Sequence, residues 1–216
     1  MPRDQLVTDW VASRFPEQSI QITPASADAS FRRYFRLTWP DGQTRILMDA
    51  PPEKEDCKPF IHVASLLAKA DLAAPRILDK DLDNGFLVLT DLGRIGYLDA
   101  LNADLSLADM LMRPVLDVLV KWQCSSTAAT LPPYDAALLR RELDLFPEWF
   151  IVRHLGVELS YDEKTMLDRT FKFLINSALN QPKVFVHRDF MPRNLMVVES
   201  EARLTPGIID FQDAVM

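Results

Sequence analysis

The stretch that decides the fold is Val184–Val198, which reads VFVHRDFMPRNLMVV. Its polar residues follow the spacing His187-x-Asp189-x-x-x-x-Asn194, and Asp210 comes 16 residues after Asn194, at the end of a second apolar run. Each polar residue stands beside β-branched or aromatic residues, which is typical of strand ends. The sequence therefore predicts that Asp189, Asn194 and Asp210 meet where short strands end.

Two carboxylates and an amide gathered in this way suit phosphoryl transfer. That reaction is catalysed mostly by positioning and charge neutralisation, with one carboxylate accepting the proton of the attacking hydroxyl. Mg²⁺ on the phosphates prefers hard oxygen ligands. The alternative makes His187 and Asp189 a satisfied polar pair and Asp210 a turn residue. Three residues that agree with one mechanism favour the catalytic interpretation.

The catalytic loop followed by Ile209-Asp210-Phe211 resembles the aminoglycoside phosphotransferase family of the protein-kinase-like superfamily. The resemblance implies ATP and Mg²⁺ as cofactors and a small-molecule substrate. It implies that Asp189 is the catalytic base, that Asn194 and Asp210 bind Mg²⁺, and that His187 braces the loop.

The first ninety residues read as a small sheet. Residues 31–38 and 44–48 are rich in strand-forming residues and flank a Pro-Asp-Gly turn, which predicts a hairpin, and residues 86–90 form a buried apolar run. We therefore expect an α+β, two-lobe, protein-kinase-like fold. An antiparallel sheet lobe, residues 1–92, would bind nucleotide, and a mainly helical catalytic lobe, residues 93–216, would follow it, with the active site in the cleft between them.

Helical periodicity and capping residues predict several helices. They are expected at Phe60–Ala70, from Ser106 to Trp122, from Asp135 towards Gly156 with an interruption near Pro147, and after the Ser160-x-x-Glu163 capping box. Short strands are expected at residues 184–186, 195–198 and 207–209.

The predicted hairpin also carries the candidate phosphate contacts. Residues 27–35 occupy the place of a phosphate-covering turn, where backbone N–H groups and Ser30 could approach phosphate. Arg32 and Arg36 would share one face of the strand, with Arg33 on the other. Solvated arginines on an exposed hairpin are an equally weighted alternative.

The resemblance also suggests contacts for adenine and for the acceptor. The segment FLVLTDLG would be the interlobe hinge, where the backbone of Thr90, Asp91 and Leu92 would meet adenine. Glu148 and Trp149 could bind a sugar, since an aromatic face stacks on C–H surfaces. The favoured alternative is an amphipathic helix with a core tryptophan.

Within the family, residues 28–36, 46–53 and 142–150 resemble those of bacterial kinases that phosphorylate N-acetylmuramic acid and N-acetylglucosamine at the anomeric hydroxyl, in cell-wall recycling. Two alternatives stay open. One is a kinase of the same family for an aminoglycoside, choline or homoserine. The other is a non-catalytic nucleotide-binding fragment.

The sequence departs from the family pattern in four ways. Met48 or a neighbour stands where a phosphate-binding lysine is usual, so that Arg32, Arg36 or Lys54 would have to replace it. His62 stands where the glutamate partner of that lysine would be. Gln212, and not glycine, follows Asp210-Phe211. Family members also continue past this point with a helical subdomain, which implies a chain truncated at its C-terminus.

Composition narrows the class of protein. The formal net charge of −7 gives no global basic field for nucleic acid. Cys57 and Cys124 have no metal-site or disulfide spacing. No apolar run approaches the length of a membrane span, and the N-terminus lacks the pattern of a signal peptide, so that we expect a cytoplasmic protein without membrane contact. The oligomeric state is left open.

Overall fold

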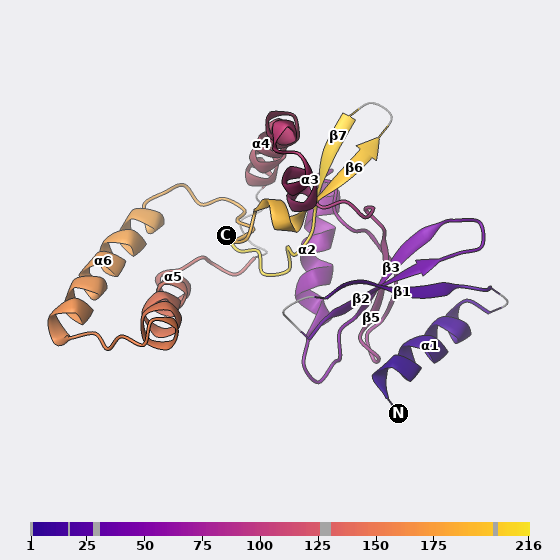
Figure 1. The fold of residues 1–216 in the computed structure, drawn as a ribbon, viewed down its shortest axis with the longest axis horizontal. Helices are drawn as coiled ribbons and strands as arrows, with labels where there is room; N and C mark the ends of the chain where they lie inside the picture. The colour runs from indigo at the N-terminus through magenta and orange to yellow at the C-terminus, as the bar shows by residue number, and fades with distance from the viewer. Residues whose placement is uncertain (1, 17, 28–30, 126–130, 201–202) are drawn as a thin grey trace. The chain divides into compact units, whose positions relative to one another are not determined.

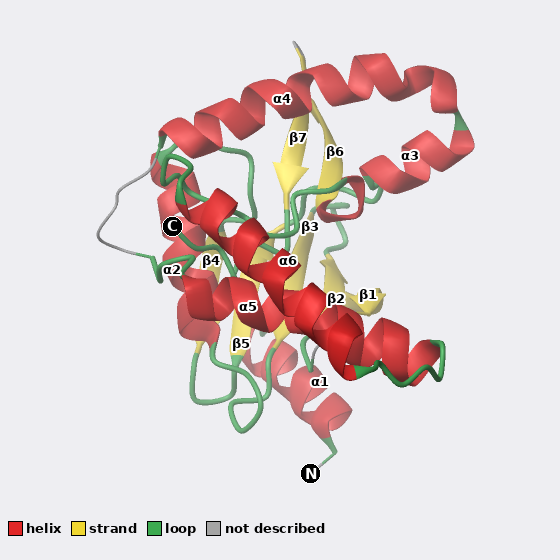
Figure 2. Ribbon diagram, turned by 90° about the vertical axis from the view of Figure 1, so that its left-hand side faces the viewer, coloured by secondary structure: helices red, strands yellow, loops and turns green. Residues whose placement is uncertain are grey.

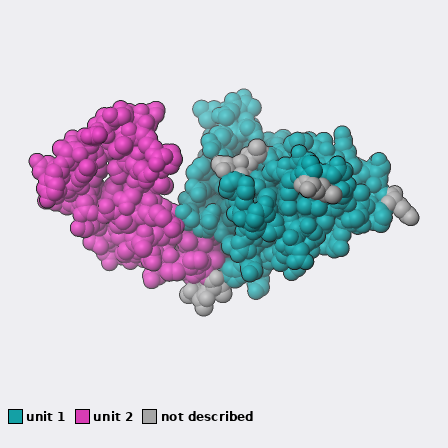
Figure 3. All heavy atoms as spheres, turned by 90° about the horizontal axis from the view of Figure 1, so that it is seen from below, with its two compact units in different colours: residues 1–125, 187–213 teal, residues 126–186, 214–216 magenta. Residues whose placement is uncertain are grey.

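The computed structural model describes residues 2–16, 18–27, 31–125, 131–200 and 203–216. The chain forms two compact units, coloured separately in Figure 3. The first contains residues 1–125 and 187–213, and the second contains residues 126–186 and 214–216. The expected lobes, 1–92 and 93–216, divide the chain at one point of the sequence, whereas these units interleave along it. The two lobes stay a prediction.

The first unit begins with a helix and a five-stranded sheet. Its elements up to the end of the sheet are α1 (Arg3–Arg14), β1 (Gln21–Ala27), β2 (Arg33–Thr38), β3 (Thr44–Asp49), α2 (Cys57–Lys69), β4 (Ile77–Asp81) and β5 (Phe86–Thr90). The strand order is β1-β2-β3-β5-β4, and every neighbouring pair is antiparallel. The predicted hairpin and the buried strand at residues 86–90 are confirmed.

One face of this sheet packs against α1 (Figure 1). The helix contributes Val7, Trp10 and Val11 to a cluster completed by Leu37, Leu47, Phe86 and Val88 of the strands. Along β5 the two residues of this cluster, Phe86 and Val88, are separated by one position, as the pleat requires for side chains on one face. The opposite face of the sheet does not contribute to this cluster.

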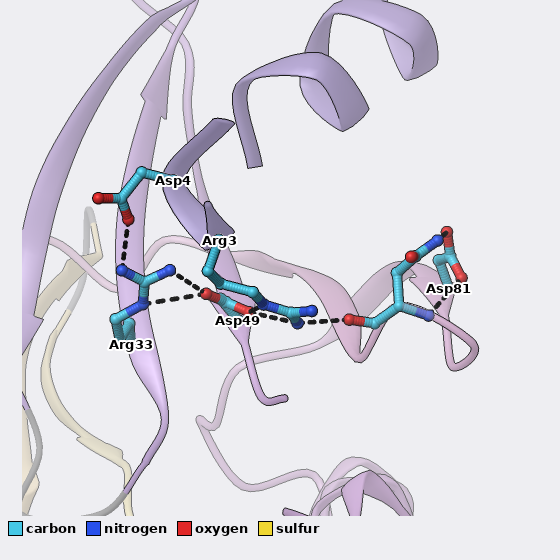
Figure 4. Close-up of polar contacts among 6 residues, drawn as sticks. Arg3, Asp4, Arg33, Asp49 and Asp81 are labelled. Atoms are coloured by element: carbon cyan, nitrogen blue, oxygen red, sulfur yellow. Dashed lines mark hydrogen bonds and ion pairs between the residues drawn. The ribbon is translucent and has the colours of Figure 1, made fainter. Parts of the chain in front are cut away.

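A charged network fastens the start of α1 to the same face (Figure 4). Asp49 is fully buried at the end of β3 and accepts hydrogen bonds from the guanidinium groups of Arg3 and Arg33. Arg33 also pairs with Asp4. Two cations satisfy a carboxylate that would be costly to bury alone.

The first unit continues with α3 (Tyr97–Ala103), η1 (Leu105–Leu107) and α4 (Ala108–Cys124), and it closes with η3 (Pro192–Asn194), β6 (Leu195–Ser200) and β7 (Arg203–Ile208). The strands β6 and β7 form an antiparallel pair, with α3 and α4 packed beside it (Figure 2). Buried Leu111, Val115 and Trp122 lie along α4, as the helical periodicity predicted. Pro114 is accommodated inside this helix.

The second unit is helical. It contains α5 (Ala136–Leu145), η2 (Phe146–His154) and α6 (Tyr161–Leu179). The caps at Asp135 and Ser160 are confirmed, the latter with both bonds of the capping box. The expected interruption near Pro147 is confirmed, because α5 ends at Leu145 and the chain continues to His154 as a π-helix with this proline in its first turn. The expected strand at residues 184–186 is reduced to one bridge, between Val186 and Val215.

Candidate active site

The catalytic loop begins at His187, whose imidazole is buried and fixed on both nitrogens. Its Nδ1 accepts a hydrogen bond from the Asp189 N–H at 3.3 Å, so the proton lies on Nε2, which donates to the Ile209 carbonyl at 3.0 Å. Burial lowers the pKa of His187, although the bond to Ile209 opposes the shift. A neutral ring in one tautomer thus connects the loop to the end of β7.

Aromatic packing holds this imidazole from behind. The ring of Trp122, on α4, lies 5.3 Å from the His187 ring, and the ring of Phe190 lies 5.7 Å from it. Trp122 is completely buried. The position of the loop therefore depends on a helix more than sixty residues earlier in the chain.

Asn194, at the end of η3, joins the remaining segments. Its side-chain Nδ2 donates to the Asp189 carbonyl at 2.9 Å, and its own carbonyl accepts from the Ile209 N–H at 3.1 Å. Ile209 therefore bonds to His187 through its carbonyl and to Asn194 through its N–H. Asp210 is covalently next to Ile209, so the structure brings the predicted residues 187, 189, 194 and 210 together.

Asp210 lies just beyond β7 in a left-handed backbone conformation, with φ of 60°. For a residue other than glycine this conformation is strained, and it is typical of functional sites. Phe211 is fully buried against Phe60 of α2, with ring centroids 4.8 Å apart. The Nε2 of Gln212 donates to Oδ1 of Asp210 at 2.9 Å. Packing and a hydrogen bond together hold the strained residue in place.

The oxygen donors at this point fit a magnesium ion. Because Asn194 commits its amide nitrogen to Asp189, its amide oxygen is the atom that could ligate a cation, and the Asp210 carboxylate could supply a second ligand. The Oε1 of Gln212 is buried and has no hydrogen-bond partner within the described residues. Oxygens of these kinds are the ligands that Mg²⁺ prefers. No three His, Cys, Asp or Glu side chains cluster as a metal site in the described part of the chain.

The predicted adenine hinge follows β5 directly. The Thr90 N–H donates to the Arg76 carbonyl, and the Thr90 hydroxyl accepts from the Arg76 N–H, both at 2.9 Å. Leu92 places a methyl group against the backbone of Gly207, close enough that a Cβ added there would lie 2.9 Å from it. The backbone contact with adenine stays a prediction.

The candidate phosphate contacts fall into three cases. Ser30 lies outside the described residues. The Nε of Arg32 lies 4.0 Å from a carboxylate oxygen of Glu55, and the Arg32 side chain is largely buried. Arg36 is also buried, and it pairs with Asp91. Two of the residues predicted to bind nucleotide thus bind each other.

The candidate sugar contacts lie in the second unit, on the π-helix. Trp149 is 53% exposed, so the core tryptophan that the sequence favoured is wrong. The Arg153 guanidinium lies 3.9 Å from the Trp149 ring centroid and pairs with Glu148 at 3.0 Å. Glu148 also lines a groove of about 560 Å³ within this unit.

Sequence reasoning missed two parts of the site. The sequence placed Trp122 on the apolar face of a predicted helix. Its position there does not show that its ring packs on the imidazole of His187. Gln212 was visible as a departure from the expected glycine, but its bond to Asp210 depends on the conformation of the turn.

Comparison with known proteins shows which family the chain belongs to. A model of the phosphotransferase enzyme family matches residues 21–216, which include every residue of the candidate site. The chain belongs to the phosphotransferase enzyme family. The resemblance seen in the sequence is therefore confirmed, and so is the α+β fold class expected from it.

Curated members of the family include close relatives. The chain is 50% identical over 223 residues to the N-acetylmuramate/N-acetylglucosamine kinase of Pseudomonas aeruginosa, with 98% of this chain and 64% of that protein covered. It is 39% identical to the enzyme of the same name from Neisseria meningitidis serogroup B, with 99% of this chain and 63% of that protein covered. The chain thus spans slightly less than two thirds of the length of these relatives.

Solved structures show the same fold at low identity. A choline kinase from Streptococcus pneumoniae aligns with a TM-score of 0.66 at 10% identity, covering 99% of this chain and 69% of the other. The ternary complex of streptomycin, ATP and APH(2″)-IIa aligns with a TM-score of 0.62 at 15% identity, covering 98% and 71%. The kinase-like fold of this phosphotransferase is therefore shared with both proteins. Within the described residues, none of its helices combines the length and apolar character that a bilayer crossing requires.

Proposed function

We propose that this chain is the catalytic part of an ATP-dependent kinase. Its acceptor would be the anomeric hydroxyl of N-acetylmuramic acid or N-acetylglucosamine. The observation that carries the catalytic part is the convergence of Asp189, Asn194 and Asp210 through the bonds of His187 and Ile209. The acceptor is supported by the names of relatives up to 51% identical. Choline and aminoglycosides enter only through structures at 16% identity or less.

In this proposal each residue has one role. Asp189 orients the acceptor hydroxyl and accepts its proton while the acceptor oxygen bonds to the γ-phosphorus and the bond from that phosphorus to the oxygen of ADP breaks. Asn194 and Asp210 hold Mg²⁺, which when bound neutralises charge on the phosphates. His187 stays neutral and positions the backbone of Asp189. The proposed acceptor is an amino sugar, and the proposed location of the reaction is the cytoplasm.

The test is a transfer assay with γ-labelled ATP and Mg²⁺. Both the 216-residue chain and the intact natural protein are incubated with N-acetylmuramic acid, N-acetylglucosamine, choline and an aminoglycoside, and the product is identified by NMR. We expect label at C1 of the two amino sugars, at least in the intact protein. Transfer to choline or the aminoglycoside alone would contradict the acceptor, and binding of ATP without any transfer would favour the non-catalytic alternative.

A further inference from the structure

The sheet of the first unit has one face whose role α1 does not explain. Leu37 and Leu47 face α1, so the alternation of side chains turns Arg36 and Ile46, which are cross-strand partners, to the opposite face. Arg36 is therefore a cation on the face away from α1. Only 9% of its side chain is exposed.

The guanidinium of Arg36 donates three hydrogen bonds to the hinge residues Asp91 and Gly93. Its Nε donates to Oδ2 of Asp91 at 2.6 Å, and its Nη2 donates to Oδ1 of Asp91 at 3.1 Å and to the Gly93 carbonyl at 2.7 Å. The Gly93 N–H returns a bond to Oδ1 of Asp91 at 2.9 Å. Asp91 and Gly93 of the hinge are thus bonded to the side chain of Arg36 on β2.

Burial and backbone geometry both indicate a fixed arrangement. The Asp91 side chain is only 6% exposed. Burial alone would raise the pKa of this carboxyl, but the hydrogen bonds from Arg36, Gly93 and Thr44 outweigh it and hold the pKa below its ordinary value. Gly93 has a backbone φ of 104°, which residues other than glycine rarely adopt. In this conformation its carbonyl accepts the hydrogen bond from Arg36.

Stability alone is a weak reason for such a pair. Apolar residues of similar volume often replace a buried ion pair without loss of stability, whereas the bidentate geometry of arginine specifies a position. Resting on the proposed function, we propose that Arg36 and Asp91 form a latch that fixes the backbone of residues 90–92 for the adenine of ATP. Arg36 thereby acts as a positioning residue through the hinge, and not as a phosphate ligand.

The two roles predict opposite effects for Asp91→Asn. If Arg36 were a phosphate ligand, loss of the competing carboxylate would leave ATP affinity unchanged or raise it. If the latch positions the hinge, the same change weakens ATP affinity, by about tenfold or more, because a small displacement of a positioning group has large effects. Arg36→Lys separates the roles again, since lysine binds phosphate but cannot make the bidentate bond.

The experiment measures Mg-ATP affinity by calorimetry for the wild-type chain, Asp91→Asn, Arg36→Lys, their double variant and Arg36→Met with Asp91→Leu. The last pair removes both charges, so it keeps the test valid if a single variant fails to fold. Asp79→Asn is the matched control, because it breaks the Arg14–Asp79 ion pair on β4 of the same sheet. Circular dichroism confirms that each variant is folded.

We expect every latch variant to lose affinity by a similar factor, the double variant to lose no more than either single variant, and Asp79→Asn to match the wild type. Unchanged or higher affinity in folded Asp91→Asn, or in the Met and Leu pair, would overturn the latch while leaving the proposed kinase intact. A wild-type chain and intact protein that bind no ATP would overturn the proposed function and the latch with it.

Discussion

Among single residues, Asp189 has the most specific proposed role, that of the catalytic base. We expect Asp189→Ala to lower the rate of phosphoryl transfer by about 10²-fold or more, because the acceptor hydroxyl loses its base. Mg-ATP affinity should stay unchanged, since neither proposed metal ligand is altered. Labelled-ATP transfer and calorimetry measure the two effects in the intact protein, and the exposed Asp109→Ala on α4 is the control. Turnover near that of the wild type would rule out Asp189 as the base.

Asp210 should behave in the opposite way. Asp210→Ala removes the carboxylate proposed to hold Mg²⁺, so we expect weaker binding of Mg-ATP but little change for ATP titrated in the presence of a chelator. Gln212→Ala should show the same pattern to a smaller degree, because it removes the bond that orients Asp210 and leaves the Asp210 carboxylate in place. Calorimetry with and without Mg²⁺ measures both. Equal Mg-ATP affinity in Asp210→Ala and the wild type would contradict the metal assignment.

His187 gives a prediction about pH. Its pKa is lowered in the folded protein by burial, whereas in the unfolded chain it lies near 6.5. The unfolded state therefore binds the proton first as the pH falls, and the free energy of unfolding decreases below about pH 6.5. Above that pH the ring is neutral in both states and contributes no slope.

Urea unfolding of the wild type and of His187→Gln between pH 8 and pH 5 measures this effect. The variant should lose part of the decrease in stability that the wild type shows in that window. Identical pH profiles for the two proteins would show that His187 does not titrate as its burial requires.

At this scale the sequence predicted the gathering of residues 187, 189, 194 and 210, because their spacing is tied to one chemistry. It did not predict the bonds of Ile209 to His187 and Asn194. These bonds use the backbone N–H and carbonyl, which are the same in almost every residue type. It also paired Arg36 with phosphate, whereas the structure pairs it with Asp91. Which of two partners a cation meets depends on tertiary packing.

The attachment of α1 is the clearest prediction at the scale of secondary-structure elements. Asp49→Ala would leave Arg3 and Arg33 facing each other without their shared carboxylate (Figure 4). We expect a loss of about 3 kcal/mol in the free energy of unfolding, at the lower end for a broken buried pair because both arginines reach solvent. Asp4→Ala removes a side chain that is 81% exposed and should cost less than about 1 kcal/mol.

Urea denaturation measures both variants. Equal and small effects would mean that the buried network contributes no more than a surface ion pair, and that apolar packing alone holds the helix on the sheet.

Elements were predictable where local signals and tertiary structure agree. The hairpin at β2 and β3, the strand β5 and the caps at Asp135 and Ser160 follow from turn residues, apolar runs and capping patterns. The strands β1 and β4 were not predicted, because each carries an irregularity in register and many polar residues. The π-helix was also missed, since a proline in its first turn reads as a break.

For the whole molecule, the second unit presents an unusual amount of apolar surface. Its exposed large side chains include Phe146, Trp149, Phe150, Leu155, Met166, Phe173 and Leu174. Large exposed apolar patches are uncommon on stable monomers, so this number of exposed apolar side chains calls for a test. We expect the 216-residue chain to bind the dye ANS while folded, and Phe173→Ser with Phe150→Ser to reduce that fluorescence. Absence of ANS binding by the folded chain would show that this surface is covered in solution.

The central claim concerns one point of the first unit, where residues far apart in the chain share one divalent ion. The most direct test is a crystal structure with Mn²⁺ in place of Mg²⁺ and a non-hydrolysable ATP analogue, using the anomalous signal of manganese to locate the ion. We expect manganese bound to the amide oxygen of Asn194 and to a carboxylate oxygen of Asp210, with the Asp189 carboxylate facing the γ-phosphate. Manganese and nucleotide bound elsewhere, with Asn194 and Asp210 contacting neither, would contradict it.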